Sequence, residues 1–210
     1  MGTCEPRRGR RATCSLGCVG TGSAAVEDVS GEARVRPRRD ADLPRLAGVL
    51  RRVHEEDGYP RQLPPDVEAW MTSERARSSW VATLGDQVVG QVSRAVAEGD
   101  QAAPLWCRAT GRSIEELAVV KRLFVDPSTR GRGIGRRLLD TVLDDAHRLG
   151  LHPVLDVDVR SVGARRMYEG AGFAYIGDAE LAWSHGGVFV AACYVGPPSP
   201  PALRSEPAGR

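Results

Sequence analysis

The chain has no hydrophobic run of the roughly 18 residues that a transmembrane helix needs. The arginines near its start are not followed by the apolar segment of a secretory signal. Its net charge of +2 at pH 7 is too small to indicate a nucleic-acid partner. We therefore expect neither a membrane nor a nucleic acid among its partners, and we expect a cytoplasmic location.

Pairs of metal ligands are also missing. The five cysteines include no Cys-x-x-Cys pair and the four histidines are scattered, so neither a disulfide framework nor a metal site is expected. What the chain does have is the composition of a globular protein, with 41% hydrophobic and 27% charged residues. Its 210 residues suit one domain with a full core.

Composition divides the chain into three parts. Residues 1–32 are rich in Gly, Ser and Arg without periodicity, and they are expected to form a disordered leader. Residues 197–210 are rich in Pro and are expected to form a disordered tail. The folded domain is therefore predicted over residues 33–196.

Hydrophobic periodicity predicts the elements of that domain. Strands are expected over residues 33–36, 80–83, 87–92, 117–125, 153–159, 175–177 and 188–195, and helices over 42–54, 66–73, 135–149 and 164–170. Residues 55–65 are expected to form a loop, and residues 93–112 carry no clear pattern. Three strands in succession before the third helix exclude a doubly wound dinucleotide fold. The order predicts an α/β fold, with a mixed sheet and helices on both faces.

A glycine-rich turn is the most informative feature of the sequence. The apolar strand at 117–125 ends at Asp126-Pro127, and glycines at 131, 133 and 135 then open an amphipathic helix. Unpaired N–H groups and the macrodipole at a helix N-terminus favour an anion. The spacing is neither that of a P-loop nor Gly-x-Gly-x-x-Gly. An isolated Arg-Gly turn is more often a simple exposed turn, but the flanking strand and helix favour a phosphate site here.

A second segment, Ala164-x-x-Met167-Tyr168-Glu169-x-x-Gly172-Phe173, follows the strand at 153–159. A tyrosine on a short helix beside a phosphate site can donate its phenolic proton to a leaving group. The alternative is a half-buried tyrosine that packs on the sheet, which is the commoner role of such a residue taken alone. The two segments have to be considered together.

Arg130-x-x-Gly133-x-Gly135 resembles the Arg/Gln-x-x-Gly-x-Gly/Ala signature of the GCN5-related N-acetyltransferase (GNAT) superfamily. The second segment resembles the Ala-x-x-Leu-Tyr-Glu-x-x-Gly-Phe segment of that family in order and spacing. The resemblance covers residues 33–196 and is strongest over 117–173, as in a single-domain member of the bacterial type. It implies the GNAT fold, in which a mostly antiparallel mixed sheet splays between strands four and five and holds acetyl-CoA in the gap.

The resemblance also implies roles for individual residues. The backbone of Leu123, Phe124 and Val125 would pair with the pantetheine arm, and Tyr168 would be the general acid for the departing thiolate. Ser161 stands where the family often has Asn, which weakens its expected contact with the cofactor. The pyrophosphate would be held by the backbone of the glycine-rich turn, which comprises Arg130, Gly131, Arg132, Gly133, Ile134, Gly135 and Arg136.

The general base is less well defined by the sequence. A primary amine with a pKa near ~10 is only about one part in a thousand neutral at pH 7, so a base or a desolvating pocket is required. Many relatives have an acidic residue where this chain has Lys121. Glu116, acting through a water, is the candidate, although such a carboxylate is more often a solvated surface charge. Glu55, Glu56 and Asp57 are further acidic candidates, and His54, Tyr59, Trp70 and Trp106 either line the acceptor pocket or pack in the core.

The sequence thus predicts an acetyl-CoA-dependent N-acetyltransferase that moves acetyl directly to a primary amine of a small molecule. Two alternatives stay open. One is acetylation of a protein N-terminus or lysine side chain, and the other is a non-catalytic module that binds acyl-CoA. Members of the family often dimerise through an exposed C-terminal strand, so a homodimer is also compatible with the sequence.

Overall fold

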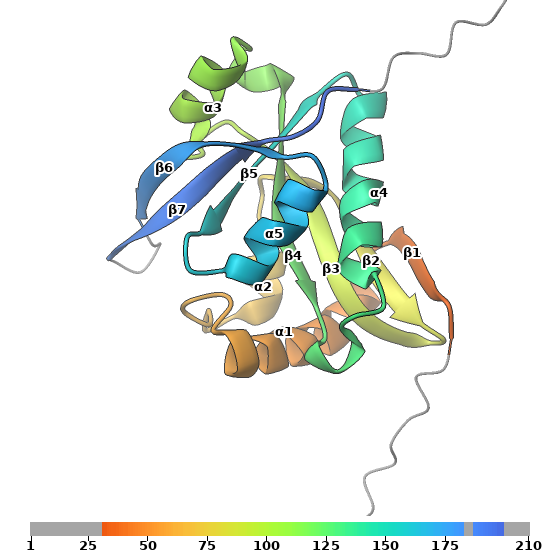
Figure 1. Cartoon of the computed structure of the whole chain (residues 1–210). Helices are drawn as coiled ribbons and strands as arrows, with labels where there is room; N and C mark the ends of the chain where they lie inside the picture. The colour runs from red at the N-terminus through yellow and green to blue at the C-terminus, as the bar shows by residue number, and fades with distance from the viewer. Residues whose placement is uncertain (1–30, 183–186, 200–210) are drawn as a thin grey trace, which may run out of the picture.

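The computed structural model describes residues 31–182 and 187–199 (Figure 1). Its strands are β1 (Ala33–Pro37), β2 (Ala76–Leu84), β3 (Gln87–Val96), β4 (Leu117–Val125), β5 (His152–Asp158), β6 (Ala174–Ala182) and β7 (Val188–Val195). They form one sheet in the order β1-β2-β3-β4-β5-β7-β6. The helices are α1 (Leu43–Asp57), α2 (Val67–Met71), α3 (Ala103–Thr110), α4 (Ile134–Arg148) and α5 (Val162–Gly170). This is the predicted α/β fold, with a mixed sheet.

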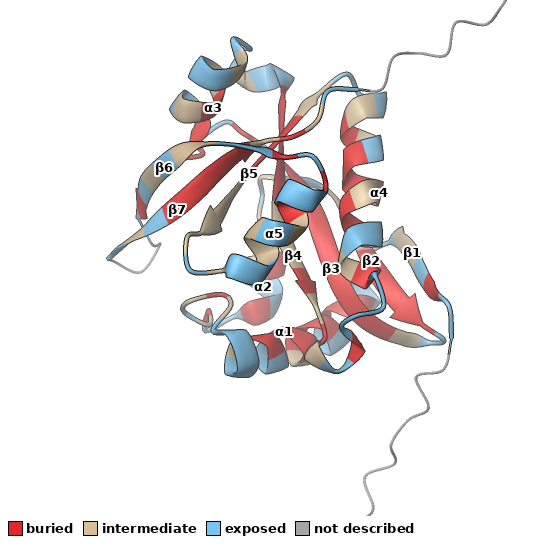
Figure 2. Ribbon diagram, in the orientation of Figure 1, coloured by how far each residue is buried: buried red, intermediate tan, exposed pale blue. Residues whose placement is uncertain are grey.

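Helices cover both faces of the sheet, and each face has its own core. Under α4 and α5, a cluster of buried side chains includes Leu138, Leu139, Leu155 and Tyr168. On the other face, α1 and α2 bury a second cluster and α3 buries a third around Trp106. In Figure 2, the central strands and the inner sides of α1 and α4 are buried, while the outer sides of these helices and most of β6 are exposed or intermediate.

The sheet splays between β4 and β5. These two parallel strands pair only at their first residues, where Leu117, Ala118 and Val119 lie opposite His152, Pro153 and Val154. The five other strand pairs of the described sheet are antiparallel. From Val120 onward, β4 therefore has a backbone edge that β5 does not pair with. The expected splay between the fourth and fifth strands is confirmed.

A bulge interrupts β4 just where it leaves β5. Ser93 of β3 pairs with Lys121 and Gln91 pairs with Phe124, so β4 has one residue more than β3 across this interval. Arg122 has a φ of 53°, a left-handed conformation that is uncommon for a residue with a side chain. A bulge of this kind re-aims the side chains on either side of it. It therefore determines what β4 presents to the gap.

Several predicted boundaries were wrong. The helix expected to end at His54 continues to Asp57, because the left-handed Gly58 is where the backbone leaves the helix. The three expected consecutive strands are interrupted by α3, which lies in the segment without a clear pattern. The strands β2, β3 and β6 are longer than predicted. The expected leader lies outside the described residues up to position 30, and the expected tail lies outside them from position 200.

No helix in the described residues is long and apolar enough to cross a membrane. The same residues contain no group of His, Cys, Asp or Glu side chains placed to hold a metal ion. A cytoplasmic location stays a prediction.

Candidate functional site

The glycine-rich turn after β4 forms an open cradle of backbone groups. Asp126 begins the turn by accepting hydrogen bonds from the backbone N–H and hydroxyl of Ser128, at 3.1 and 2.8 Å. Gly131 and Gly133 then adopt left-handed φ values of 77° and 72°, and α4 begins at Ile134. A Cβ atom on either glycine would meet no described atom within 4 Å. The turn thus leaves open space at the N-terminus of a long helix, whose first N–H groups have no partner within the helix, and this suits an anion.

The third glycine of the motif, Gly135, allows close packing and does not form part of the open turn. Gly135 lies inside α4 with ordinary helical φ, and a Cβ there would sit 3.3 Å from Sδ of Met167 and 3.8 Å from Cγ2 of Val125. The absence of a side chain therefore brings the start of α4 close to α5 and to the end of β4. This close approach places the cradle directly beside the unpaired edge of β4.

The arginines around the cradle are held by other groups. Arg130 pairs with Glu56 and Asp57 at the end of α1. Arg136 donates 2.7 Å to Asp140 and 3.1 Å to the carbonyl oxygen of Gly170. Glu56 and Asp57, expected in a loop over the acceptor, thus belong to a helix end that is tied to the cradle. An anion at this turn would therefore be bound by backbone N–H groups more than by these guanidinium groups.

The backbone of Leu123–Val125 runs along the gap. The side chains of Leu123 and Val125 pack under α4 and α5, whereas Phe124 is buried on the opposite face with α1 and α2. Because the side chains of Leu123–Val125 pack in the two cores, only the backbone N–H and carbonyl groups of this part of β4 face β5. An extended ligand can pair with such an edge as an added strand would.

Tyr168 approaches the same gap from α5. Its residue is 8% exposed, and its ring packs edge-on against Phe173 at 5.8 Å between centroids. Its hydroxyl makes no hydrogen bond to any described residue, and burial raises the pKa of the phenol well above its ordinary value. Ser161 lies at the N-cap of α5, where its side chain makes no capping hydrogen bond. The structure therefore brings Tyr168, the β4 edge and the cradle together.

Lys121, at the position where an acid was expected, belongs to a partly buried ion network on the face of the sheet opposite to α4 and α5. Its Nζ lies 3.2 Å from Oδ2 of Asp100 and also pairs with Oδ1 of Asp156 on β5. Burial alone would lower the pKa of this amine, but the charges of Asp156 and Asp100 raise it above its ordinary value. Asp156 lies on β5 two residues beyond Val154, the last residue that pairs with β4, and its carboxylate reaches across to Lys121 of β4. No local sequence pattern pointed to Asp156.

A loop from the α1–α2 connection closes over this face. Arg61 donates hydrogen bonds of 3.0 and 2.8 Å to Asp158 at the end of β5. His54 Nδ1 lies 2.7 Å from the carbonyl oxygen of Pro60. Tyr59 and Trp70 pack edge-to-face at 6.3 Å between centroids. Tyr59 and Trp70 are partly buried beside β4, whereas His54 anchors the loop.

Two other expected residues lie elsewhere. Trp106 belongs to α3 and is fully buried, so it packs in the core, with Nζ of Lys121 at 5.9 Å from the centre of its ring. Glu116 lies in an exposed turn before the paired end of β4 and accepts 2.9 Å from the N–H of Ser113 and 3.2 Å from Arg112. The N–H of Ser113 holds the pKa of Glu116 below its ordinary value, which weakens it as a base. The structure does not bring Glu116 to Tyr168.

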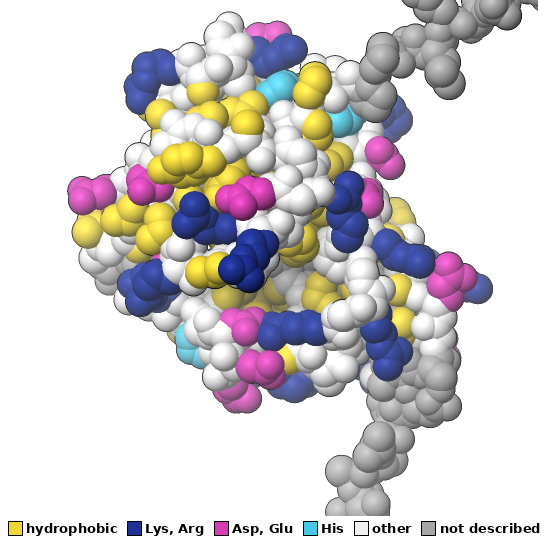
Figure 3. Space-filling model, in the orientation of Figure 1, with side chains coloured by type: hydrophobic (Ala, Val, Ile, Leu, Met, Phe, Trp, Pro, Cys, Tyr) yellow, Lys and Arg dark blue, Asp and Glu magenta, His cyan; other side chains and the backbone are white. Residues whose placement is uncertain are grey.

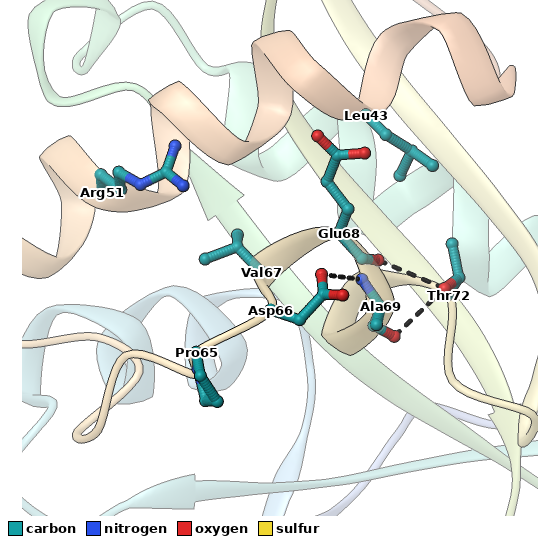
Figure 4. Close-up of a pocket in the computed structure, with 8 residues that line it drawn as sticks. All are labelled: Leu43, Arg51, Pro65, Asp66, Val67, Glu68, Ala69 and Thr72. Atoms are coloured by element: carbon teal, nitrogen blue, oxygen red, sulfur yellow. Dashed lines mark hydrogen bonds between the residues drawn. The ribbon is translucent and has the colours of Figure 1, made fainter.

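The surface around the gap is hollowed. In Figure 3, basic side chains surround a hollow between α5 and α1, and hydrophobic side chains line its floor. Two further depressions flank α1. One lies between α1 and α2, where Asp66 caps α2 through the N–H of Ala69 at 2.9 Å and Arg51 faces the opening (Figure 4). The other lies between the end of α1 and the turn at Asp126. Neither of these two is lined by Tyr168 or Leu123–Val125.

Comparisons with known proteins agree with this geometry. A family model described as "Acetyltransferase (GNAT) family" matches residues 45–173. Over 113 residues the chain is 34% identical to N-acetyltransferase 8B of Rattus norvegicus, an alignment that covers 53% of this chain and 46% of the relative. Over 118 residues it is 28% identical to N-acetylaspartate synthetase of Xenopus tropicalis, with 55% and 37% covered. The chain thus spans less than half the length of these two relatives.

Among solved structures, a putative acetyltransferase from Salmonella typhimurium with its cofactor acetyl-CoA has the same fold. The TM-score is 0.58 at 18% identity, and the match covers 79% of this chain and 93% of that one.

Proposed function

Because the chain belongs to the acetyltransferase (GNAT) family, we propose that it transfers acetyl from acetyl-CoA directly to a primary amine of a small molecule. The observation that carries the proposal is that the open cradle, the unpaired edge of β4 and the buried phenol of Tyr168 surround one gap. One of its relatives is named for a small N-acetylated product, N-acetylaspartate, which supports a small-molecule acceptor.

The described residues fit acetyl-CoA, which supplies an activated acyl group as a thioester when bound. The backbone of the turn at Gly131 and Gly133 would bind the pyrophosphate through N–H groups. A side chain at either glycine would be strained by its left-handed backbone. The edge of β4 over Leu123–Val125 binds the pantetheine arm through main-chain hydrogen bonds. A backbone N–H of the same edge donates to the carbonyl oxygen as negative charge develops on it.

Two side chains then move protons. Asp156 accepts the proton that the amine loses as its nitrogen bonds to the carbonyl carbon. Tyr168 gives its phenolic proton to the sulfur as the carbon–sulfur bond breaks, so an N-acetyl product and a free thiol leave the site. The raised pKa keeps the phenol of Tyr168 protonated at neutral pH, which is the form that a general acid requires.

Release of free thiol from acetyl-CoA, measured against amines and peptides, tests this function. Small amines are expected to react faster than peptides. Tyr168→Phe should lower kcat by about 100-fold or more and leave the Kd for acetyl-CoA unchanged. The matched control is Tyr175→Phe, because Tyr175 is 50% exposed and its hydroxyl bonds to Asp178 away from the gap.

Other results would favour other functions. Faster reaction of peptides would indicate a protein acetyltransferase. Tight binding of acetyl-CoA with no turnover on any amine would indicate a non-catalytic module. Equal kcat in Tyr168→Phe and wild type would exclude the phenol as the general acid.

A further inference from the structure

The bulge in β4 places two consecutive cations on one face of the sheet. Lys121 contacts Trp106 under α3, and Arg122 contacts Trp70 on α2. In a regular strand, neighbouring side chains would point to opposite faces. The flanking side chains of Val120 and Leu123 lie on the other face, under α4 and α5. Because the extra residue re-aims Arg122, its guanidinium joins Lys121 on the face that the α1–α2 loop covers.

The two cations differ in how they are neutralised. Lys121 pairs with Asp100 and Asp156. No described carboxylate forms an ion pair with Arg122, whose guanidinium carbon lies 4.5 Å from the centre of the Trp70 ring. Burial, together with the nearby charges of Arg75 and Arg38, lowers the pKa of Arg122 to about 10. A half-buried cation beside like charges is energetically unfavourable unless an anion joins it.

The side chains near Arg122 have more hydrogen-bond donors than acceptors. Arg38 donates 2.8 Å to the carbonyl oxygen of Met71 and 3.2 Å to Oε1 of Gln91. Burial also lowers the pKa of Arg38. Gln91 is fully buried, and its Nε2 has no hydrogen-bond partner among the described residues. This second observation is independent of Arg122 and points the same way, because a buried N–H group without an acceptor is rare.

From this surplus of donors we propose that the acceptor amine carries a carboxylate and that Arg122 binds it. The inference rests on the proposed acetyl transfer and names its substrate class, which is an amino acid with a free carboxylate. Stacking on Trp70 occupies one face of the guanidinium and leaves its N–H edges available. A carboxylate can accept two parallel hydrogen bonds from such an edge. Lysine at this position could not make that planar, two-pronged contact.

The placement of Arg122 also fits the short distance between the amine and carboxylate of an amino acid. Arg122 directly follows Lys121, whose partner Asp156 lies at the gap where acetyl transfer is proposed. An amino acid whose carboxylate is bound by Arg122 therefore has its amine close to the carboxylate of Asp156. A peptide N-terminus offers an amide at the same place, so Arg122 discriminates free amino acids from peptides. Tyr59, which packs on Trp70, forms part of the cover over this site.

The experiment compares amino acids with their carboxamides, which keep the amine and lose the charge. Leucine and leucinamide, aspartate and isoasparagine, and 4-aminobutyrate and its amide form the panel, with kcat/KM measured by thiol release. Wild type should prefer the carboxylate member of at least one pair. Arg122→Gln should lower that preference about tenfold or more, the value of one charged hydrogen bond. Arg122→Lys should retain part of it, and Arg34→Gln, an exposed arginine on β1, should retain all of it.

Binding of the same panel to the protein saturated with CoA separates this inference from the proposed function. If no amine releases thiol but an amino acid binds and Arg122→Gln abolishes its binding, acetyl transfer is wrong and the carboxylate site stands. If wild type neither prefers nor binds the carboxylate member of any pair, the carboxylate site is wrong. An unchanged preference in Arg122→Gln, with unchanged affinity for CoA, would also overturn it and leave Arg122 as a packing residue.

Discussion

At the scale of single residues, two carboxylates compete for the role of proton acceptor. Asp156 lies on β5, pairs with Lys121 and influences the pKa of Tyr168. Glu116 caps an exposed turn beyond the paired end of β4. Asp156→Asn should therefore lower kcat by about 100-fold or more, whereas Glu116→Gln should leave it unchanged. Steady-state thiol release measures both, with the Kd for acetyl-CoA as the check that the cradle is intact.

Asp156→Asn also removes a partner of the partly buried Lys121, so the stability of this variant needs a separate measurement. Circular dichroism against denaturant would detect the loss, and Asp100 should retain enough charge near Lys121 to keep the protein folded. A large fall in kcat for Glu116→Gln, with full activity in Asp156→Asn, would reverse the two assignments. The base would then act through water from the far end of β4.

Site residues that belong to a local sequence motif could be predicted, whereas site residues that only the fold brings together could not. Tyr168 and the glycines carry motif spacing, so their sequence positions were sufficient to propose them. Asp156 is 35 positions from Lys121, and no local pattern links the two. The unusual Lys121 was a signal that the expected base lies elsewhere. Arg122 was missed because its direction depends on a bulge, which one added residue in the strand pairing creates.

At the scale of elements, the turn into α4 is the part whose chemistry is most directly testable. Gly133→Ala and Gly133→Glu share the same backbone strain at φ 72°, which costs about 1–2 kcal/mol. Neither side chain meets a described atom near its Cβ. Only the glutamate adds negative charge where the pyrophosphate is proposed to bind. Gly133→Glu should therefore weaken CoA binding about tenfold or more beyond Gly133→Ala, as measured by isothermal titration calorimetry.

The dependence of CoA binding on salt is the internal control for Gly133→Ala and Gly133→Glu. The extra loss in Gly133→Glu should shrink as ionic strength rises, because exposed charges are screened, and the loss in Gly133→Ala should not. If the two variants bind CoA equally well, the phosphate does not lie at this turn.

The bounds of each helix and strand were predicted well where its local sequence pattern was strong and poorly where it was weak. Helix α4 buries six apolar residues on one face and was found almost to its ends, since periodicity of that length is distinctive. Helix α3 was missed because its eight residues bury only Ala103 and Trp106. The end of α1 was set too early because acidic residues Glu55–Asp57 looked like loop, although Gly58 was the true stop signal. Strand lengths depended on partners that no local pattern specifies.

At the scale of the whole molecule, the splay of the sheet was predicted from the family resemblance, because periodicity does not specify which strands become neighbours. The splay between β4 and β5 is a property of the assembled sheet. It places the cradle, Tyr168 and the Lys121–Asp156 pair around one gap, although they come from four elements. The same assembly leaves several acidic side chains buried against arginines, and these determine how the fold responds to acid.

Asp42, Asp126 and Asp158 should make the protein sensitive to acid. Hydrogen bonds from Arg36 lower the pKa of Asp42. Burial would raise the pKa of Asp126 and Asp158, but hydrogen bonds from Arg52 and Ser128, and from Arg160 and Arg61, leave both below their ordinary value. An aspartate in the unfolded chain has a pKa near about 3.9. Since all three folded values are lower, their stabilisation is complete above that pH and is lost as pH falls through the folded values.

The contribution of these three aspartates to the free energy of unfolding, measured with urea, should therefore be nearly constant between about pH 7 and 5 and fall steeply below about pH 4. Asp42→Asn, which breaks a buried pair with Arg36 at 2.7 Å, should cost about 1.5–3 kcal/mol at pH 7 and make the acid loss shallower. Asp86→Asn, at an exposed turn residue, is the control and should change neither. A parallel, undiminished acid slope in Asp42→Asn would mean that other carboxylates carry the acid sensitivity, because removing a titrating group must remove its share of the proton uptake.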